Sequence, residues 1–202
     1  MKMHIGPFWI ACMVACIAFA PLQPATAQAG VSRPERKLDV WYVPTTAEVL
    51  DRMLDMARIR PTDVIYDLGC GDGRIVIAAA KNYGVRAVGV DLDPDRIREA
   101  RANAKAAGVE ALVTFTVGDL FKTDLREASV VTLYLLPELN RRLIPKLFAE
   151  LKPGARVLSH DWDMGKNWPP DQQLKLGSDN IYLWVMPALA GRKVPGASAK
   201  NK

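Results

Sequence analysis

The sequence predicts a single doubly wound α/β domain, with a Rossmann-like, mostly parallel sheet covered by helices. Short runs of β-branched residues alternate with helix-like segments, at the spacing that βαβ units produce. A glycine-rich turn follows the first strand-like run, and an acidic residue follows each of the first three runs. Ligands in this fold class bind at the carboxyl ends of the strands, so these residues predict a ligand site there.

The strand-like and helix-like segments can be assigned in order along the chain. Strands are expected at residues 64–66, 87–90, 112–117, 130–135, 155–159 and 181–185. Helices are expected after residue 46, at 74–81, from the capping Asp93 to Gly108, and at 139–151. Together these elements place the folded domain at residues 39–187, followed by a flexible tail at 188–202.

Composition and charge set limits on the partners. The 202 residues are 50% hydrophobic and 24% charged, which is ordinary for a soluble globular domain. The net charge of +5 is compatible with association at an anionic membrane surface. No run of basic residues is interleaved with aromatic residues, so no nucleic-acid partner is expected.

Residues 1–29 carry the three-part pattern of a secretory signal peptide. A weakly positive start precedes an apolar run at residues 8–20, and the small residues of the sequence AQA precede Gly30. The apolar run is shorter than the ~20 residues that a membrane-spanning helix needs. We therefore expect cleavage and export to the periplasm or the medium, after which residues 30–38 form a lead-in. An uncleaved N-terminal membrane anchor is the alternative.

The turn after the first strand has glycines at alternate positions. Gly69, Gly71 and Gly73 form G-x-G-x-G in the sequence DLGCGDG, and glycine permits the tight turn and close ligand approach needed there. The dinucleotide fingerprint G-x-G-x-x-G requires a third glycine where this chain has Arg74. This difference disfavours an NAD(P)-dependent oxidoreductase, although that activity stays an alternative.

Three carboxylates lie at the ends of three successive strands. Asp91 ends the second strand, where a carboxylate can accept hydrogen bonds from ribose hydroxyls. Asp119 follows the third strand and can accept from an adenine amino group, while Asp67 can face a cationic amine. Three such placements around one glycine turn favour a nucleoside ligand over isolated capping roles.

These motifs, DLGCGDG, VGVDLDP and VGDL, resemble the cofactor framework of class I methyltransferases that use S-adenosyl-L-methionine (SAM). The resemblance implies that the strand at 181–185 is inserted antiparallel. It also implies that Leu92 packs on adenine and that Leu120 acts with Asp119 at the adenine edge. The cofactor-binding residues expected within these motifs are Asp67, Gly69, Gly71, Gly73, Asp91, Leu92, Asp119 and Leu120.

A narrower resemblance involves the sequence DVWYVPTT at residues 39–46 and the helix after it. This arrangement is similar to the small protein-lysine methyltransferases that include the ATP synthase c-subunit lysine methyltransferases. It implies that Tyr42 contributes to cofactor binding, with Pro44 and Thr45 also at the cofactor entrance. It also implies a lysine side chain of a protein as the methyl acceptor, and the hydrophobic N-terminus favours an acceptor protein associated with a membrane.

The acceptor side carries weaker signals. Tyr134 after the fourth strand and Asp161 after the fifth are the candidate catalytic residues, and Glu138 and Trp162 are further candidates. The N-P-P-Y motif of adenine and glutamine methyltransferases is absent from the end of the fourth strand. A lone His160 is more typical of a structural residue than of a zinc ligand, so no metal is expected. A small-molecule methyltransferase and a non-catalytic SAM-binding domain are further alternatives.

Overall fold

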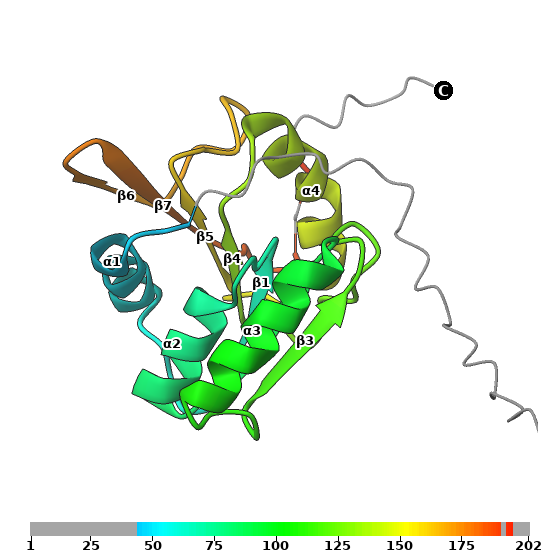
Figure 1. The fold of residues 1–202 in the computed structure, drawn as a ribbon. Helices are drawn as coiled ribbons and strands as arrows, with labels where there is room; N and C mark the ends of the chain where they lie inside the picture. Colours follow the sequence, from blue (N-terminus) through cyan, green and yellow to red (C-terminus); the bar gives the residue numbers. More distant parts are fainter. Residues whose placement is uncertain (1–43, 191–192, 196–202) are drawn as a thin grey trace, which may run out of the picture. The chain divides into compact units, whose positions relative to one another are not determined.

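A computed structural model describes residues 44–190 and 193–195 of the chain (Figure 1). The expected signal peptide, the lead-in and Tyr42 lie outside the described residues, as does most of the expected tail. Cleavage, export and the role of Tyr42 therefore stay predictions.

One seven-stranded sheet organises the described residues, in the order β3-β2-β1-β4-β5-β7-β6. Its strands are β1 (Val64–Leu68), β2 (Arg86–Asp91), β3 (Val113–Val117), β4 (Val130–Leu133), β5 (Arg156–His160), β6 (Gln172–Leu176) and β7 (Asp179–Val185). Strands β1 to β5 run parallel, and β7 is antiparallel to both of its neighbours. The predicted mostly parallel sheet and its antiparallel late strand are therefore confirmed.

Strand β6 is a strand that the sequence did not predict. Its sequence, QQLKL, has only Leu174 and Leu176 as apolar residues, and three of its five side chains are exposed. It forms the edge of the sheet and pairs with β7 across a turn at Gly177. An exposed edge strand needs little apolar sequence, so the hydrophobic pattern gave a weak signal.

Within residues 44–190, four helices cover the sheet: α1 (Ala47–Ala57), α2 (Arg74–Tyr83), α3 (Pro94–Ala106) and α4 (Pro137–Glu150). The first three pack into one buried cluster on one face, with α2 beside α3, and α4 packs into a second cluster on the other face (Figure 1). Helices on both faces make the sheet doubly wound, as predicted. None of the helices in the described ranges is both long and apolar enough to cross a bilayer.

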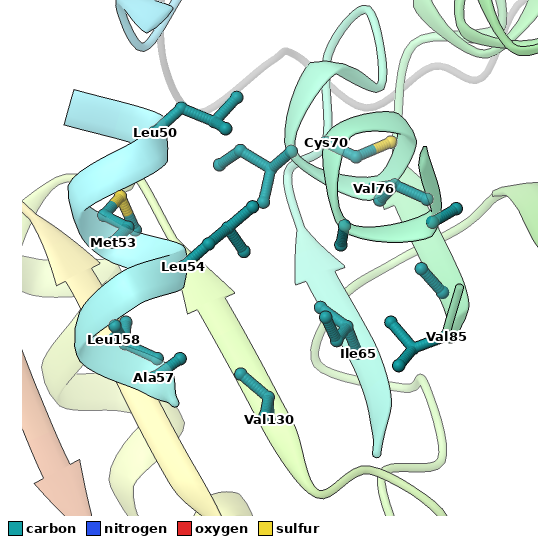
Figure 2. Packing of buried hydrophobic residues seen from close by; sticks show 14 of the residues in the cluster. Leu50, Met53, Leu54, Ala57, Ile65, Cys70, Val76, Val85, Val130 and Leu158 are labelled. Carbon is teal, nitrogen blue, oxygen red and sulfur yellow. The ribbon is translucent and has the colours of Figure 1, made fainter. Parts of the chain in front are cut away.

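Helix α1 packs on the sheet and thereby positions the residues that precede it, including Thr45. Thr46 caps its N-terminus by accepting a hydrogen bond from the Val49 amide at 3.4 Å. The buried side chains of α1 follow the three- and four-residue spacing of one helix face, which includes Met53 and Ala57. This face packs on the sheet near Leu158 of β5 (Figure 2). Residues just before α1 are thereby held at the sheet.

The other face is closed partly by a loop. Residues 161–171 connect β5 to β6, and this loop buries Met164 and Trp168 against α4 and β7. The indole nitrogen of Trp184 in β7 donates to the Trp168 carbonyl at 3.0 Å. The loop that begins at residue 161, directly after β5, is therefore anchored by aromatic packing.

Candidate functional site

The glycine turn joins β1 to α2 at the carboxyl end of the sheet. The amides of Gly69 and Cys70 both donate to the Val90 carbonyl of β2, at 2.8 and 3.0 Å. Gly73 has a φ of +80°, and a Cβ there would lie 2.7 Å from the Phe115 ring and 2.9 Å from the Ala100 side chain. The backbone therefore packs against α3 and β3 at a distance that excludes a side chain.

Asp91 lies beside this turn, at the end of β2. Its Oδ2 accepts from the Gly71 amide and its Oδ1 from the Asp93 amide, both at 2.9 Å. A carboxylate has about four lone-pair positions, so both oxygens can still accept from hydroxyl groups. Leu92, the next residue, is half-buried. The predicted ribose-binding carboxylate is thus held rigidly by two backbone amides.

Asp119 is positioned by the turn that follows β3. The preceding Gly118 amide donates to the Asp91 carbonyl at 2.8 Å, which brings the two strand ends together. Asp119 Oδ1 accepts from the Phe121 amide at 3.0 Å. Leu120 is half-buried and packs against the cluster on the α4 face. The residues predicted to contact adenine therefore lie next to the predicted ribose site.

Asp67 in β1 is a buried carboxyl group, 3% exposed. Its Oδ1 accepts a hydrogen bond from the Thr132 hydroxyl of β4 at 2.7 Å. Burial raises the pKa of Asp67 to about 7, against the hydrogen bond from Thr132, which lowers it. A bound cation would favour the ionised form, so this site suits a positively charged amino group.

The polar groups at these strand ends therefore fit SAM. A rigid carboxylate suits the ribose, and a second carboxylate at the adjacent strand end suits adenine. The buried Asp67, with the carboxylates of Asp91 and Asp72 as its charged neighbours, suits the methionine amine. The turn brings backbone within reach of the same region, because its three glycines carry no side chains. The predicted cofactor residues of the glycine turn and of the three carboxylate motifs lie at the ends of β1, β2 and β3.

Tyr134 and Asp161, the two predicted catalytic residues, meet at the ends of β4 and β5. The Tyr134 hydroxyl donates to Asp161 Oδ2 at 3.3 Å. Burial, together with the negative charge of Asp161, raises the pKa of Tyr134, so the phenol stays protonated at neutral pH. Asp161 has a φ of 61°, and its Oδ1 accepts from the Asn180 amide at 3.0 Å. The pair is therefore held by the start of β7.

His160 lies behind this pair and is 2% exposed. Its ring centroid is 3.9 Å from that of Tyr134. Its Nδ1 is 3.2 Å from Thr45 Oγ1, and its Nε2 is 3.1 Å from Asp179 Oδ1 and 3.6 Å from Asp161 Oδ2. The sequence favours a structural role for His160, and the structure places it in contact with both predicted catalytic residues.

Asp179 was missed from the sequence for a topological reason. It is the first residue of β7, and β7 is antiparallel to β5. The start of an antiparallel strand lies at the edge where parallel strands end, so Asp179 reaches the site. The sequence predicts this strand from residue 181, which leaves Asp179 in a loop.

His160, Asp161 and Asp179 are also the one group, among the described residues, whose ligand atoms are close enough to hold a metal ion. Their ligand atoms lie within 4.8 Å of one another. Both ring nitrogens of His160 already lie within hydrogen-bonding distance of an oxygen. The absence of a metal stays a prediction.

Arg74 connects the cofactor side of the site to the acceptor side. Its guanidinium bonds the Asp72 carboxylate at 3.0 and 2.7 Å, within the glycine turn, and also donates to the Thr45 carbonyl at 2.7 Å. Thr45 in turn contacts His160 through its side chain. The residue before the cap of α1 thus contacts both halves of the site.

Two exposed apolar side chains follow Tyr134 and Asp161 along the chain. Leu136 and Trp162 are 43% and 42% exposed, and they follow the ends of β4 and β5. The buried Asn140 holds both segments, because its amide donates to the Leu136 carbonyl at 3.2 Å and its side chain to the Trp162 carbonyl at 2.9 Å. Glu138, another candidate, is exposed in the first turn of α4.

Known proteins resemble this chain in sequence and in structure. A family model described as the ANTKMT methyltransferase domain matches residues 67–172. A protein-lysine N-methyltransferase of Saccharolobus islandicus is 46% identical over 150 residues, which cover 72% of this chain and 92% of that protein. The ATP synthase c-subunit lysine N-methyltransferase of Mus musculus is 36% identical over 157 residues, which cover 78% of this chain and 62% of the mouse protein.

A solved structure is also similar. The RNA methyltransferase from Salinibacter ruber, in complex with S-adenosyl-L-homocysteine, has a TM-score of 0.72 and 53% sequence identity, covering 76% of this chain and 97% of that one. Because all of these proteins are methyltransferases, the alternative of an NAD(P)-dependent oxidoreductase is wrong. With the SAM-compatible geometry described above, they show that the chain belongs to the ANTKMT methyltransferase-domain family and is a SAM-dependent methyltransferase.

Proposed function

We propose that this methyltransferase transfers the methyl group of SAM to the side-chain nitrogen of a lysine in a protein. The observation that carries the proposal is the hydrogen-bonded pair of Tyr134 and Asp161 next to the cofactor half of the site. Similar proteins from an archaeon and a mouse are named for methylating protein lysines, which supports the same acceptor chemistry here.

The pair suits an amine that must lose a proton before it reacts. SAM supplies an electrophilic methyl group when bound. A lysine has an unperturbed pKa of about 10.4, so at neutral pH it arrives mostly as an ammonium group. Asp161 Oδ2 can accept the ammonium proton, and the Tyr134 hydroxyl oxygen can accept a hydrogen bond from the remaining N–H. Together these residues can orient the nitrogen lone pair toward the methyl group.

The proposed acceptor lysine lies in a membrane-associated protein. The exposed side chains of Leu136 and Trp162, which closely follow the two predicted catalytic residues along the chain, support this choice, because they can pack against apolar residues that flank the lysine. Relatives are named for the ATP synthase c-subunit and for adenine nucleotide translocase, which supports an acceptor of this kind. The net charge of +5 is compatible with an anionic membrane surface.

We further propose that the protein works outside the cytoplasm after cleavage behind residue 29. The apolar run at residues 8–20 and the small residues before Gly30 support this location. Expression of the full chain in a bacterial host, followed by fractionation and N-terminal sequencing, tests it. We expect a mature protein that begins at Gly30. A membrane-bound protein that begins at Met1 or Lys2 would instead favour the anchored alternative.

The decisive test of the acceptor leaves the substrate open. Purified protein is incubated with methyl-labelled SAM and an envelope extract, and the labelled molecule is identified by mass spectrometry. We expect label on a membrane protein as mono-, di- or trimethyl-lysine, and we expect an Asp91→Ala variant, impaired in SAM binding, to lose it. Label on RNA, as the name of the Salinibacter relative suggests, or on a small molecule would contradict the lysine assignment.

A further inference from the structure

His160 occupies the middle of a row of hydrogen-bonding groups that come from three separate parts of the chain. Thr45 precedes α1, His160 ends β5, and Asp179 begins β7. Thr45 Oγ1 lies 3.2 Å from the ring Nδ1, and Asp179 Oδ1 lies 3.1 Å from the ring Nε2. Thr45 is 3% exposed and His160 is 2% exposed, so water has little access to replace either contact.

The partners at the two ends of this row favour one tautomer of the ring. Two carboxylates, Asp179 at 3.1 Å and Asp161 at 3.6 Å, face Nε2, and both require a donor there. A hydroxyl group can either donate or accept, so the Thr45 hydroxyl is able to donate to Nδ1. The consistent assignment is a hydrogen on Nε2, shared with the carboxylates, and a lone pair on Nδ1.

The oriented ring has a direct effect on the acceptor residues. Its face lies against the Tyr134 ring, with centroids 3.9 Å apart and an angle of 35° between the planes. Its Nε2 edge lies against Asp161, whose Oδ2 also accepts from the Tyr134 hydroxyl. If the ring rotated or changed tautomer, Tyr134 would lose its ring contact with His160 or Asp161 would lose the hydrogen at Nε2.

We propose that His160, oriented by Thr45 and Asp179, is the positioning residue that fixes Tyr134 and Asp161 for the incoming amine. His160 itself does not touch the reacting atoms. The proposal rests on the proposed lysine methylation for its kinetic consequence, whereas its structural part concerns this chain alone.

A matched pair of substitutions tests the kinetic consequence. Thr45→Val keeps the shape of a β-branched side chain and the backbone carbonyl that Arg74 binds, but it removes the hydroxyl. Thr45→Ser keeps the hydroxyl. We expect Thr45→Val to lower kcat about tenfold, the effect of losing about 1.4 kcal/mol of transition-state stabilisation, and we expect Thr45→Ser to restore most of it. The dissociation constant for SAM should change less than twofold in both variants.

A control variant tests whether kcat responds to any substitution near the acceptor residues. Lys175→Gln alters an exposed side chain of β6, opposite Asn180 of β7, and should leave kcat unchanged. If Thr45→Val and Thr45→Ser lower kcat equally, the Thr45 hydroxyl is not responsible and the proposal is wrong. If their SAM affinity falls in parallel with kcat, Thr45 acts through the cofactor half and the proposal is also wrong.

A spectroscopic measurement tests the orientation without any acceptor. The chain has two histidines, His4 and His160, so nitrogen-15 spectra of the imidazoles are simple, and a His160→Gln variant assigns the signals. We expect His160 to show one tautomer, protonated at Nε2, and Thr45→Val to shift the Nδ1 signal, because that nitrogen loses its hydrogen-bond donor. A signal protonated at Nδ1, with Nε2 free to bind a metal, or an averaged signal of two tautomers would overturn the proposal.

The two measurements distinguish the ways in which the proposals can fail. If wild-type protein methylates no lysine but shows the Nε2-protonated tautomer, the proposed acceptor is wrong and the orientation of His160 stands. If lysine is methylated and the ring is not fixed, the proposed function stands and the positioning role fails.

Discussion

The two halves of the active site are built in different ways. On the cofactor side, the predicted ligand groups lie within short segments at the ends of β1, β2 and β3. Backbone amides hold Asp91 and Asp119, and the Thr132 side chain of β4 holds Asp67. On the acceptor side, side chains from distant segments hold one another, as in the contact between Thr45 and His160, which are 115 residues apart. The residues of the cofactor half are therefore marked mostly by local sequence, and the acceptor half depends on the complete tertiary fold.

This difference has a functional reason in the proposed scheme. A cofactor presents the same ribose, adenine and amine to every enzyme that uses it, so one turn with a few carboxylates serves many acceptors. An acceptor differs from enzyme to enzyme, so its site is assembled from loops and strand ends that can vary independently. If the two halves are separable, substitutions in the acceptor half should change methyl transfer and substitutions in the cofactor half should change SAM binding.

The largest effect is expected for Asp161→Asn. Asparagine tolerates the positive φ of this position and can keep the hydrogen bond from the Asn180 amide, so the variant removes the charge together with the Oδ2 acceptor that faces the Tyr134 hydroxyl. We expect kcat to fall roughly 10²-fold, the lower end of the range for general acid–base groups. Kinetics at saturating acceptor, with the SAM dissociation constant from calorimetry, provide the measurement.

Asp163→Asn is the matched control for this prediction. Asp163 is an exposed carboxylate in the same loop, and it caps the Gly165 amide. Its removal should leave both kcat and SAM affinity within twofold. An Asp161→Asn variant that loses SAM affinity as well would show that the two halves are not separable.

The next largest effect is expected for Asp91→Ala, on the cofactor side. Loss of charge-assisted hydrogen bonds to the ribose should weaken the binding of SAM and of its demethylated product by about 1.5–3 kcal/mol. Calorimetry with both ligands measures the change, and Asp95→Asn, an exposed carboxylate in the first turn of α3, is the control. Undiminished binding by the Asp91 variant would contradict the ribose assignment.

The sequence predicted the cofactor half more completely than the acceptor half, for the same structural reason. Asp67, Asp91 and Asp119 could be assigned because each lies at a strand end marked by its own local pattern. Their structural positions agree with the assignment, although the role of each residue stays a prediction. Thr45 was placed only near the cofactor entrance, by resemblance, and its contact with His160 was not foreseen.

Two features of the acceptor half left no local signal. Asp179 reaches the site only because β7 is antiparallel, and Asn140 holds Leu136 and Trp162 from inside α4. Neither fact follows from spacing along the chain. Edge strand β6 was missed because an exposed strand needs few apolar residues. Sequence patterns therefore report what is buried or locally repeated, and they miss contacts made by topology alone.

A smaller effect, on stability, is expected for Gly73→Ala, and it measures how tightly the turn packs. The added Cβ meets Phe115 and Ala100 at less than 3 Å, and φ is already +80°. We expect the free energy of unfolding to fall by about 1–3 kcal/mol more than in Gly84→Ala. Gly84 has a similar φ of +68° with open space around its Cβ, so it isolates the backbone cost.

Urea denaturation of both glycine variants gives the comparison. Equal losses of stability would mean that the turn has room for a side chain, and the close backbone approach would not be the reason for glycine at this position. A larger loss for Gly73→Ala, with SAM binding weakened in the surviving folded protein, would confirm that the packing of the turn supports the cofactor half.

The smallest effect on SAM binding is expected from pH, through Asp67. Its pKa in the folded, ligand-free protein is about 7, above the ordinary value of 3.8, because the carboxyl group is buried. The folded state therefore binds the proton more tightly than the unfolded state. The stability due to this group is complete below pH 3.8 and is lost as the pH rises to about 7. Asp67→Asn, which never ionises, should remove this loss and stabilise the ligand-free protein at about pH 7.5.

SAM binding should show the opposite dependence, because a cationic amino group favours the ionised carboxylate. Between about pH 6 and pH 7.5 the affinity of wild-type protein should rise roughly eightfold, as expected for a single group with a pKa of about 7, and binding at the lower pH should release a proton. This prediction is limited to a pH of about 7.5 because the α-amino group of SAM begins to lose its own charge near a pH of about 7.7–8.0. Asp67→Asn should bind more weakly at the upper pH and show a flat profile. Calorimetry in buffers with different ionisation enthalpies measures both quantities, and equal pH profiles for the two proteins would show that Asp67 does not face the cofactor amine.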